Sequence, residues 1–220
     1  LKDTTRSTGR DALKKNVQAA IALAGAIRST LGPKGLDKLL IDDDGRTLVT
    51  NDGVTVLETA KVEHPVAKMI IGASSLQDKI AKDGTTSTVI LASEMLRNAW
   101  ELVVQGIHPA VIARGFRMAE QKIIEEMDDY AISGNEKLFK QAAMAALSGK
   151  GHDSLKHTVG ELSLTAGKYV KNKNGEMEKE KIKIIAQTGS VIEDSEVVKG
   201  LVLAKKRIDL AMPKKIENGS

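Results

Sequence analysis

Apolar residues recur every three or four positions through much of the first 130 residues, which is the spacing of one face of a helix. This pattern predicts four long helices, over residues 11–29, from Pro65 onward, from Gly84 to about Gly106, and from Pro109 onward. Proline at the start of two of these segments is typical of a first helical turn. The faces expected to lie in the core are Leu13, Val17, Ile21 and Ala24; Val66, Met69, Ile70, Ala73 and Leu76; Val89, Ala92, Leu96, Ala99 and Val103; and Ile112, Phe116, Ala119, Ile123 and Met127.

One β insertion interrupts these helices. The stretch LLIDDDGRTLVT, residues 39–50, predicts two short strands around an Asp44-Gly45 turn, which is a good hairpin signal. A second Asp-Gly pair at residues 52–53 predicts another turn.

After Gly134, which marks a plausible boundary, the pattern changes. Helices are expected at residues 138–147 and 153–170, and the segments IKIIA (182–186) and VVKGLVLAKK (197–206) look like strands. The predicted fold class is therefore α+β: a mainly helical first part with one β-hairpin, followed by a small α/β unit.

Composition narrows the possible functions. Of 220 residues, 41% are apolar, which is enough for a packed core. The net charge is only +4 and aromatic residues make up 2%, so neither charge nor stacking groups favour nucleic-acid binding. The chain contains no cysteine and no apolar run of membrane-spanning length, and its first residues do not resemble a signal peptide.

The stretch KIAKDGTTSTVIL, residues 79–91, places an acid, a glycine and three hydroxyls where a helix is expected to begin. The first N–H groups of a helix attract a phosphate. Gly84 would allow close approach, Thr85, Thr86 and Ser87 would donate, and Asp83 could hold Mg²⁺. The alternative is that Asp83 or Thr85 merely caps the helix.

Two more glycine-bearing loops favour the hypothesis of a phosphate site over that of a simple helix cap. TLGPKG (30–35) follows the first predicted helix, and NDGVT (51–55) follows the hairpin. An ordinary helix stop would explain Gly32 but not the whole of TLGPKG, whereas a hairpin turn alone would explain NDGVT. No Walker A sequence and no G-x-G-x-x-G sequence is present, so three loops that converge on a nucleotide would form a different phosphate cradle.

Five segments in this order, TLGPKG, VTNDGVT, VEHPVAKMI, QDK..KDGTTST and QGIHPAVIARGF, resemble the N-terminal half of a chaperonin subunit. VEHPVAKM and GIHP are more similar to the group II branch, the thermosome and TCP-1 type, than to the bacterial branch. SGKG (148–151) and TGSVIEDSEVVKGLVL (188–203) also fit. The resemblance implies an incomplete chaperonin fold: residues 1–137 in the equatorial ATP-binding domain, 138–204 in the ascending part of the intermediate domain, and 205–220 at the start of the apical domain.

The resemblance also implies roles for single residues. Asp52 would orient the attacking water, and Asp83 would hold the metal. The residues implied to bind the nucleotide are Leu31, Gly32, Pro33, Gly53, Gly84, Thr85, Thr86, Ser87, Gly149 and Lys150, with Lys150 sensing the γ-phosphate. This sequence departs from the family pattern at Lys82, where glycine is usual, and at Ser87, where threonine is common.

The implied function is that of an ATP-dependent molecular chaperone in the cytoplasm. ATP or ADP with Mg²⁺ would be bound, other chaperonin subunits would complete a homo- or hetero-oligomeric double ring, and unfolded polypeptides would be the clients. The full-length subunit would be an ATPase, but a second catalytic aspartate is expected in a later part of such a subunit. The alternative is a truncated chaperonin-like module that binds nucleotide weakly and does not hydrolyse it. A phosphotransferase is disfavoured because no residue resembles a substrate-side base.

Overall fold

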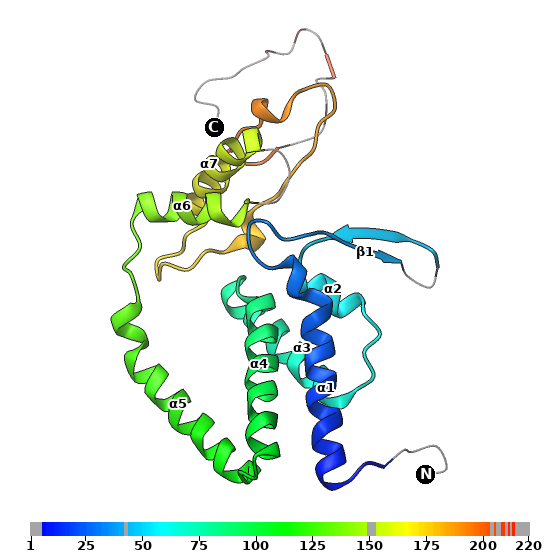
Figure 1. Cartoon of the computed structure of the whole chain (residues 1–220). Helices are drawn as coiled ribbons and strands as arrows, with labels where there is room; N and C mark the ends of the chain where they lie inside the picture. Colours follow the sequence, from blue (N-terminus) through cyan, green and yellow to red (C-terminus); the bar gives the residue numbers. More distant parts are fainter. Residues whose placement is uncertain are drawn as a thin grey trace. The chain divides into compact units, whose positions relative to one another are not determined.

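A computed structural model describes residues 6–41, 44–148 and 153–202, and the single positions 205, 208, 209, 211 and 213. The chain divides into two compact units, Leu1–Ser133 and Gly134–Ser220 (Figure 1). The second unit begins at the glycine that the sequence marked as a boundary. The assignment of equatorial, intermediate and apical domains stays a prediction.

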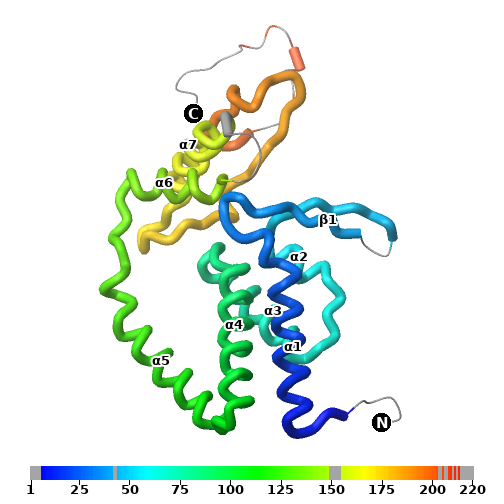
Figure 2. Tube along the Cα trace, in the orientation of Figure 1, coloured from blue at the N-terminus to red at the C-terminus, as the bar shows by residue number. Residues whose placement is uncertain are grey.

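The first unit is mainly helical and contains a two-stranded antiparallel sheet (Figure 2). Its elements are α1 (Gly9–Ile27), a 3-10 turn η1 (Arg28–Thr30), β1 (Lys38–Ile41), β2 (Thr47–Thr50), α2 (Gly53–Thr59), α3 (Pro65–Ala81), α4 (Thr85–Val104) and α5 (Pro109–Tyr130). The four long predicted helices and the hairpin are confirmed, and so is the predicted fold class.

Histidine and proline set the start of two helices. Pro65 and Pro109 occupy the first turns of α3 and α5, where a missing N–H costs nothing. The preceding His64 and His108 accept hydrogen bonds through Nδ1 from the N–H groups two residues later, at 3.3 and 3.2 Å. Both histidines therefore act as helix caps.

The core of the first unit lies between α1, α2, α3 and α4. Its buried cluster consists of Ala20, Leu23, Ala24, Ile27, Val56, Leu57, Ala67, Ile70 and Val89. The predicted core faces are only partly correct: Ala24, Ile70 and Val89 are buried, whereas Ile21, Met69 and Leu76 are exposed. On α1 and α3, small residues such as Ala20 and Ala67 occupy the contact because they let helices approach closely.

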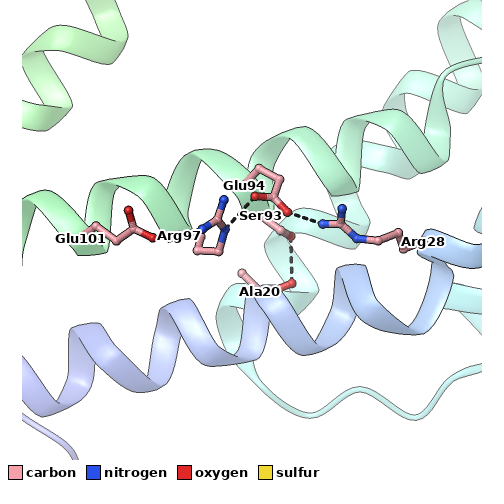
Figure 3. A network of polar contacts seen from close by, with 6 residues as sticks. All are labelled: Ala20, Arg28, Ser93, Glu94, Arg97 and Glu101. Atoms are coloured by element: carbon pink, nitrogen blue, oxygen red, sulfur yellow. Dashed lines mark hydrogen bonds and ion pairs between the residues drawn. The ribbon is translucent and has the colours of Figure 1, made fainter.

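α1 and α4 run antiparallel, and polar contacts define their register. Near one end, Arg10 Nη2 donates to the Val103 carbonyl at 3.2 Å. Near the middle, the buried Ser93 hydroxyl donates to the Ala20 carbonyl at 2.8 Å (Figure 3). Because both helices rise equally per residue, this register places the end of α1 at Arg28 level with the start of α4.

The hairpin has the predicted position, but the prediction of a second turn at Asp52 and Gly53 was wrong. β1 and β2 pair in the register Lys38–Thr50 to Ile41–Thr47. Asp52 and Gly53 do not form a turn of their own: they begin α2, and Asp52 Oδ2 accepts from the Thr55 N–H at 3.0 Å and from its hydroxyl at 2.6 Å. An N-cap satisfies these groups as well as a turn would.

The predicted burial of α5 was also wrong. No residue of this helix is buried, and Ile123 and Met127 are 61% and 60% exposed. α5 meets α4 close to the turn that joins them and then runs away from it (Figures 1 and 2). From Arg117 onward the helix thus has an apolar face that the described residues of its own unit do not cover, whereas Ile112, Ala113 and Phe116 are half-buried.

The second unit contains α6 (Glu136–Ala146), α7 (Asp153–Tyr169) and two 3-10 turns, Lys179–Lys181 and Ile192–Asp194. Two ion pairs, Lys140–Glu161 and Lys168–Glu136, join α6 to α7. The strands predicted at 182–186 and 197–206 are not formed in their described residues, because no neighbouring segment pairs with them. Across the described helices, none is long and apolar enough to cross a membrane.

Candidate phosphate-binding site

The start of α4 has no side-chain cap. Gly84 is its N-cap, in the left-handed conformation with φ +80° and ψ 9°, and no side chain in the described part of the protein bonds to the first N–H groups. By contrast, α2, α3, α5 and α6 are capped by Asp52, His64, His108 and Asn135, whereas the start of α1 at Thr8 also lacks a side-chain cap. The structure therefore contradicts the alternative that the side chain of Asp83 or Thr85 caps α4. The N–H groups and the partial positive charge of this helix end are available to an anion.

Residues 82–87 run from the C-cap of α3 into the first turn of α4, and we call them the phosphate turn. Its first residue, Lys82, ends α3 with φ +57°, and it is the one non-glycine residue with positive φ in the described part of the chain. Lys82 Nζ pairs with Asp78 at 2.6 Å. Lysine thus adopts the conformation that glycine reaches most easily, at some cost in strain.

Asp83 lies exposed at the centre of this turn, and its Oδ1 accepts from the Gly84 N–H at 2.7 Å. Within the described residues, no three acidic or histidine side chains gather to form a metal cage. A single carboxylate nevertheless fits Mg²⁺, which commonly binds through one or two carboxylates together with phosphate oxygens and water. Thr85 and Thr86 are half-buried, and Ser87 is exposed.

The start of α2 lies against the phosphate turn. A Cβ placed on the buried Gly53 would meet Thr86 Oγ1 at 2.2 Å and Thr86 Cβ at 3.3 Å. Only glycine permits this contact. It brings Asp52 and Gly53 next to Thr86, although more than 30 residues separate them in the sequence.

The loop after α1 closes on itself. Gly35 N–H donates to the Gly32 carbonyl at 2.9 Å, and Leu36 N–H donates to the Ser29 carbonyl at 2.7 Å. Pro33 takes the second position of the turn, which its ring favours. Gly32 has φ +85° and open space on its Cβ side, and Leu31 is 48% exposed.

An ionic network ties the end of α1 to α4. Arg28 and Arg97 both donate to the Glu94 carboxylate (Figure 3), and Arg97 also pairs with Glu101 at 3.0 Å. The hydrogen bond from Arg97 is the main cause that lowers the pKa of the Glu94 carboxyl, and the hydrogen bond from Arg28 is the second. The hydrogen bond between Arg97 and Glu94 also raises the pKa of Arg97. Arg28 lies three residues before Leu31, so this network attaches the end of α1, where that loop begins, to α4.

The structure therefore brings Gly53 directly against Thr86, and it places the loop of Leu31, Gly32 and Pro33 at the same end of the α1–α4 pair. Gly149 and Lys150 lie outside the described residues. Two residues that the sequence analysis did not select, Ser74 and Gln77 of α3, donate to carbonyls of the phosphate turn. A polar pair three positions apart beside a predicted apolar face was the signal that could have indicated them.

Comparison with known proteins identifies the family of this chain. The sequence model of the TCP-1/cpn60 chaperonin family matches residues 23–220. The chain belongs to the TCP-1/cpn60 chaperonin family. It is 43% identical to thermosome subunit beta of Methanothermobacter thermautotrophicus, over 98% of this chain and 40% of that protein. It is 44% identical to thermosome subunit beta of Archaeoglobus fulgidus, over 98% and 41%, and 41% identical to a thermosome subunit of Methanocaldococcus jannaschii, over 97% and 40%.

These findings confirm the resemblance to a group II chaperonin. The chain spans about two fifths of the length of the curated relatives that it matches.

Proposed function

We propose that the loop 31–33, the start of α2 at residues 52–53 and the residues 83–87 form the phosphate- and metal-binding part of an ATP site in a chaperonin subunit. The observation that carries this proposal is the uncapped start of α4, with Gly84 at φ +80° and Gly53 packed against Thr86. A helix start with free N–H groups and glycine backbone is suited to a phosphate chain.

Each residue has a task that its surroundings support. The N–H groups and hydroxyls of Thr85, Thr86 and Ser87 would donate to phosphate oxygens, and Asp83 would hold Mg²⁺. The metal, when bound, would neutralise charge that develops on the phosphates. Asp52 uses Oδ2 to cap α2, so its Oδ1 would accept a hydrogen bond from the attacking water. Gly32 and Pro33 would line the nucleotide.

The proposals for the whole subunit are broader. It would hydrolyse ATP, assemble with other chaperonin subunits into a double ring in the cytoplasm, and assist the folding of unfolded polypeptides. Gly149 and Lys150 would respond to the γ-phosphate. The second candidate, a module that binds nucleotide weakly without hydrolysis, is favoured for the 220 residues alone, since they span about two fifths of their relatives and phosphoryl transfer depends on complete positioning.

The decisive experiment is calorimetric titration of the protein with Mg-ATP. We expect Asp83→Ala to weaken binding at least tenfold, or about 1.4 kcal/mol, because the metal loses its carboxylate. Asp129→Ala, which removes an exposed carboxylate near the end of α5, is the matched control and should bind as the wild type does. Equal affinity of Asp83→Ala and wild type would refute the metal role.

Size and turnover separate the two candidates. If the longer subunit is the working form, size-exclusion chromatography of that subunit should show a large ring and its ATPase activity should exceed that of the 220-residue chain. Equal and negligible turnover in both, with no ring, would leave the weakly binding module.

A further inference from the structure

Two side chains of α3 contact the backbone of the phosphate turn. Ser74 Oγ donates to the Thr85 carbonyl at 3.0 Å, and Gln77 Nε2 donates to the Asp83 carbonyl at 3.1 Å. The carbonyl between them, that of Gly84, accepts from the N–H and the hydroxyl of Thr88, both at 2.9 Å. Three consecutive carbonyls of the turn are therefore held by donors from α3 and α4.

These contacts determine where the N–H groups point. In a planar trans peptide, the carbonyl of one residue and the N–H of the next lie on opposite sides. Holding the carbonyls of Asp83, Gly84 and Thr85 on α3 and α4 therefore directs the N–H groups of Gly84, Thr85 and Thr86 the other way. The Gly84 N–H already donates to Asp83 Oδ1, whereas the N–H groups of Thr85 and Thr86 belong to the first turn of α4, where intrahelical acceptors are lacking.

Burial of the side chain accounts for the hydrogen bond of Ser74 but not for that of Gln77. Ser74 is 1% exposed, so its hydroxyl needs a protein acceptor in any case. Gln77 is only half-buried and could donate to water instead. Its amide also lies close to Gly84: a Cβ there would lie 3.3 Å from Gln77 Nε2, a tight contact to which the Gln77 side chain would have to adjust. Gln77 is therefore the more informative of the two residues.

We propose that Ser74 and Gln77 are positioning residues of the nucleotide site, which hold the carbonyls of the phosphate turn so that its N–H groups are preorganised for a triphosphate. This inference rests on the proposed function. A fixed turn binds more tightly because less ordering remains to be done on binding, so the two side chains act on phosphate affinity without touching the ligand.

The test is the affinity of the full chain for Mg-ATP in two variants. Gln77→Glu keeps the size of the side chain but replaces the donor with an acceptor that repels the Asp83 carbonyl. Ser74→Ala removes the buried hydroxyl. We expect dissociation constants raised about tenfold for Gln77→Glu and about fivefold for Ser74→Ala. Gln121→Glu, which makes the same change on the exposed α5, is the control and should leave affinity unchanged.

Thermal unfolding, followed by the fluorescence of Trp100 in α4, separates positioning from a purely structural role. Weaker binding by Gln77→Glu with an unchanged melting temperature supports the inference if Gln77→Met, which removes the amide donor without adding a negative charge beside the phosphates, also weakens binding. Unchanged affinity in the folded Gln77→Glu variant overturns it, even if Ser74→Ala unfolds. If the wild type binds Mg-ATP and Asp83→Ala does not, while Gln77→Glu binds normally, then the positioning role fails and the proposed function stands. Absence of binding by the wild type overturns both.

Discussion

α4 and α5 follow one another in the chain and have similar lengths, 20 and 22 residues. Both have apolar residues at helical spacing, yet their surroundings differ. α4 buries Val89 and Ser93 against α1, and its first turn belongs to the phosphate turn. α5 buries none of its residues. Periodicity thus shows that a helix has a face to bury, but not which element, if any, covers it.

Loss of core packing should give the largest difference between the two regions. Ile27 in α1 is fully buried in the α1–α4 core, whereas Ile123 in α5 is 61% exposed. We expect Ile27→Ala to lower the free energy of unfolding by about 2–5 kcal/mol and Ile123→Ala to change it by less than about 0.5 kcal/mol. Urea unfolding followed by Trp100 fluorescence measures both. A large loss from Ile123→Ala would show that the α5 face is covered in solution, for example by a second copy.

Replacement of the residue that ends a helix should change the free energy of unfolding by less, and in opposite directions for α3 and α5. Lys82 ends α3 with φ +57°, whereas Ala131 ends α5 with φ −71° and ψ 128°. Lys82→Gly should raise the free energy of unfolding by about 0.5 kcal/mol, because relief of left-handed strain exceeds the added chain entropy. Ala131→Gly relieves nothing and should cost about 0.5 kcal/mol. If Lys82→Gly is destabilising, then the Lys82–Asp78 ion pair matters more to the turn than its backbone conformation does.

The smallest effect is expected from the exposed charges. Arg97 is the main cause of the lowered pKa of Glu94 in α4. A carboxylate with a lowered folded-state pKa adds stability that is fully present above its unfolded-state pKa of about 4.3, and this stability is lost as the pH falls through the folded-state pKa. Arg97→Gln should therefore flatten the acid side of the stability profile without moving the melting temperature at acid pH.

A matched pair on α5 tests whether this effect depends on location. Lys122→Gln removes the Lys122–Glu126 contact of 3.0 Å, which also joins two residues of one helix. We expect the stability profile of this variant between pH 3 and 7, followed by thermal unfolding, to keep the wild-type form. The same flattening in both variants would mean that any helix-surface pair has this effect, and that the Glu94 network has no special place between α1 and α4.

Much of the local backbone geometry at the candidate site could be predicted because short-range chemistry determines it. Glycine and aspartate at 83–84 mark a bend before a helix, and proline at 65 and 109 marks helix starts. The packing of Gly53 against Thr86 could not be predicted, since the two residues are more than 30 positions apart in the sequence. Ser74 and Gln77 were missed for the same reason: their acceptors are carbonyls of a turn that folds back onto α3.

The sequence by itself determined the long helices of the first unit, the hairpin and membership of the chaperonin family, because periodicity, caps and ordered motifs are properties of neighbouring residues. Only the tertiary structure decided that Ala20 and Ala67 pack in the core while Met69 does not, that Asp52 caps a helix, and that residues 182–186 pair with no strand among the described residues. Burial and strand pairing need a partner surface, and a linear pattern of apolar residues does not specify which surface that is.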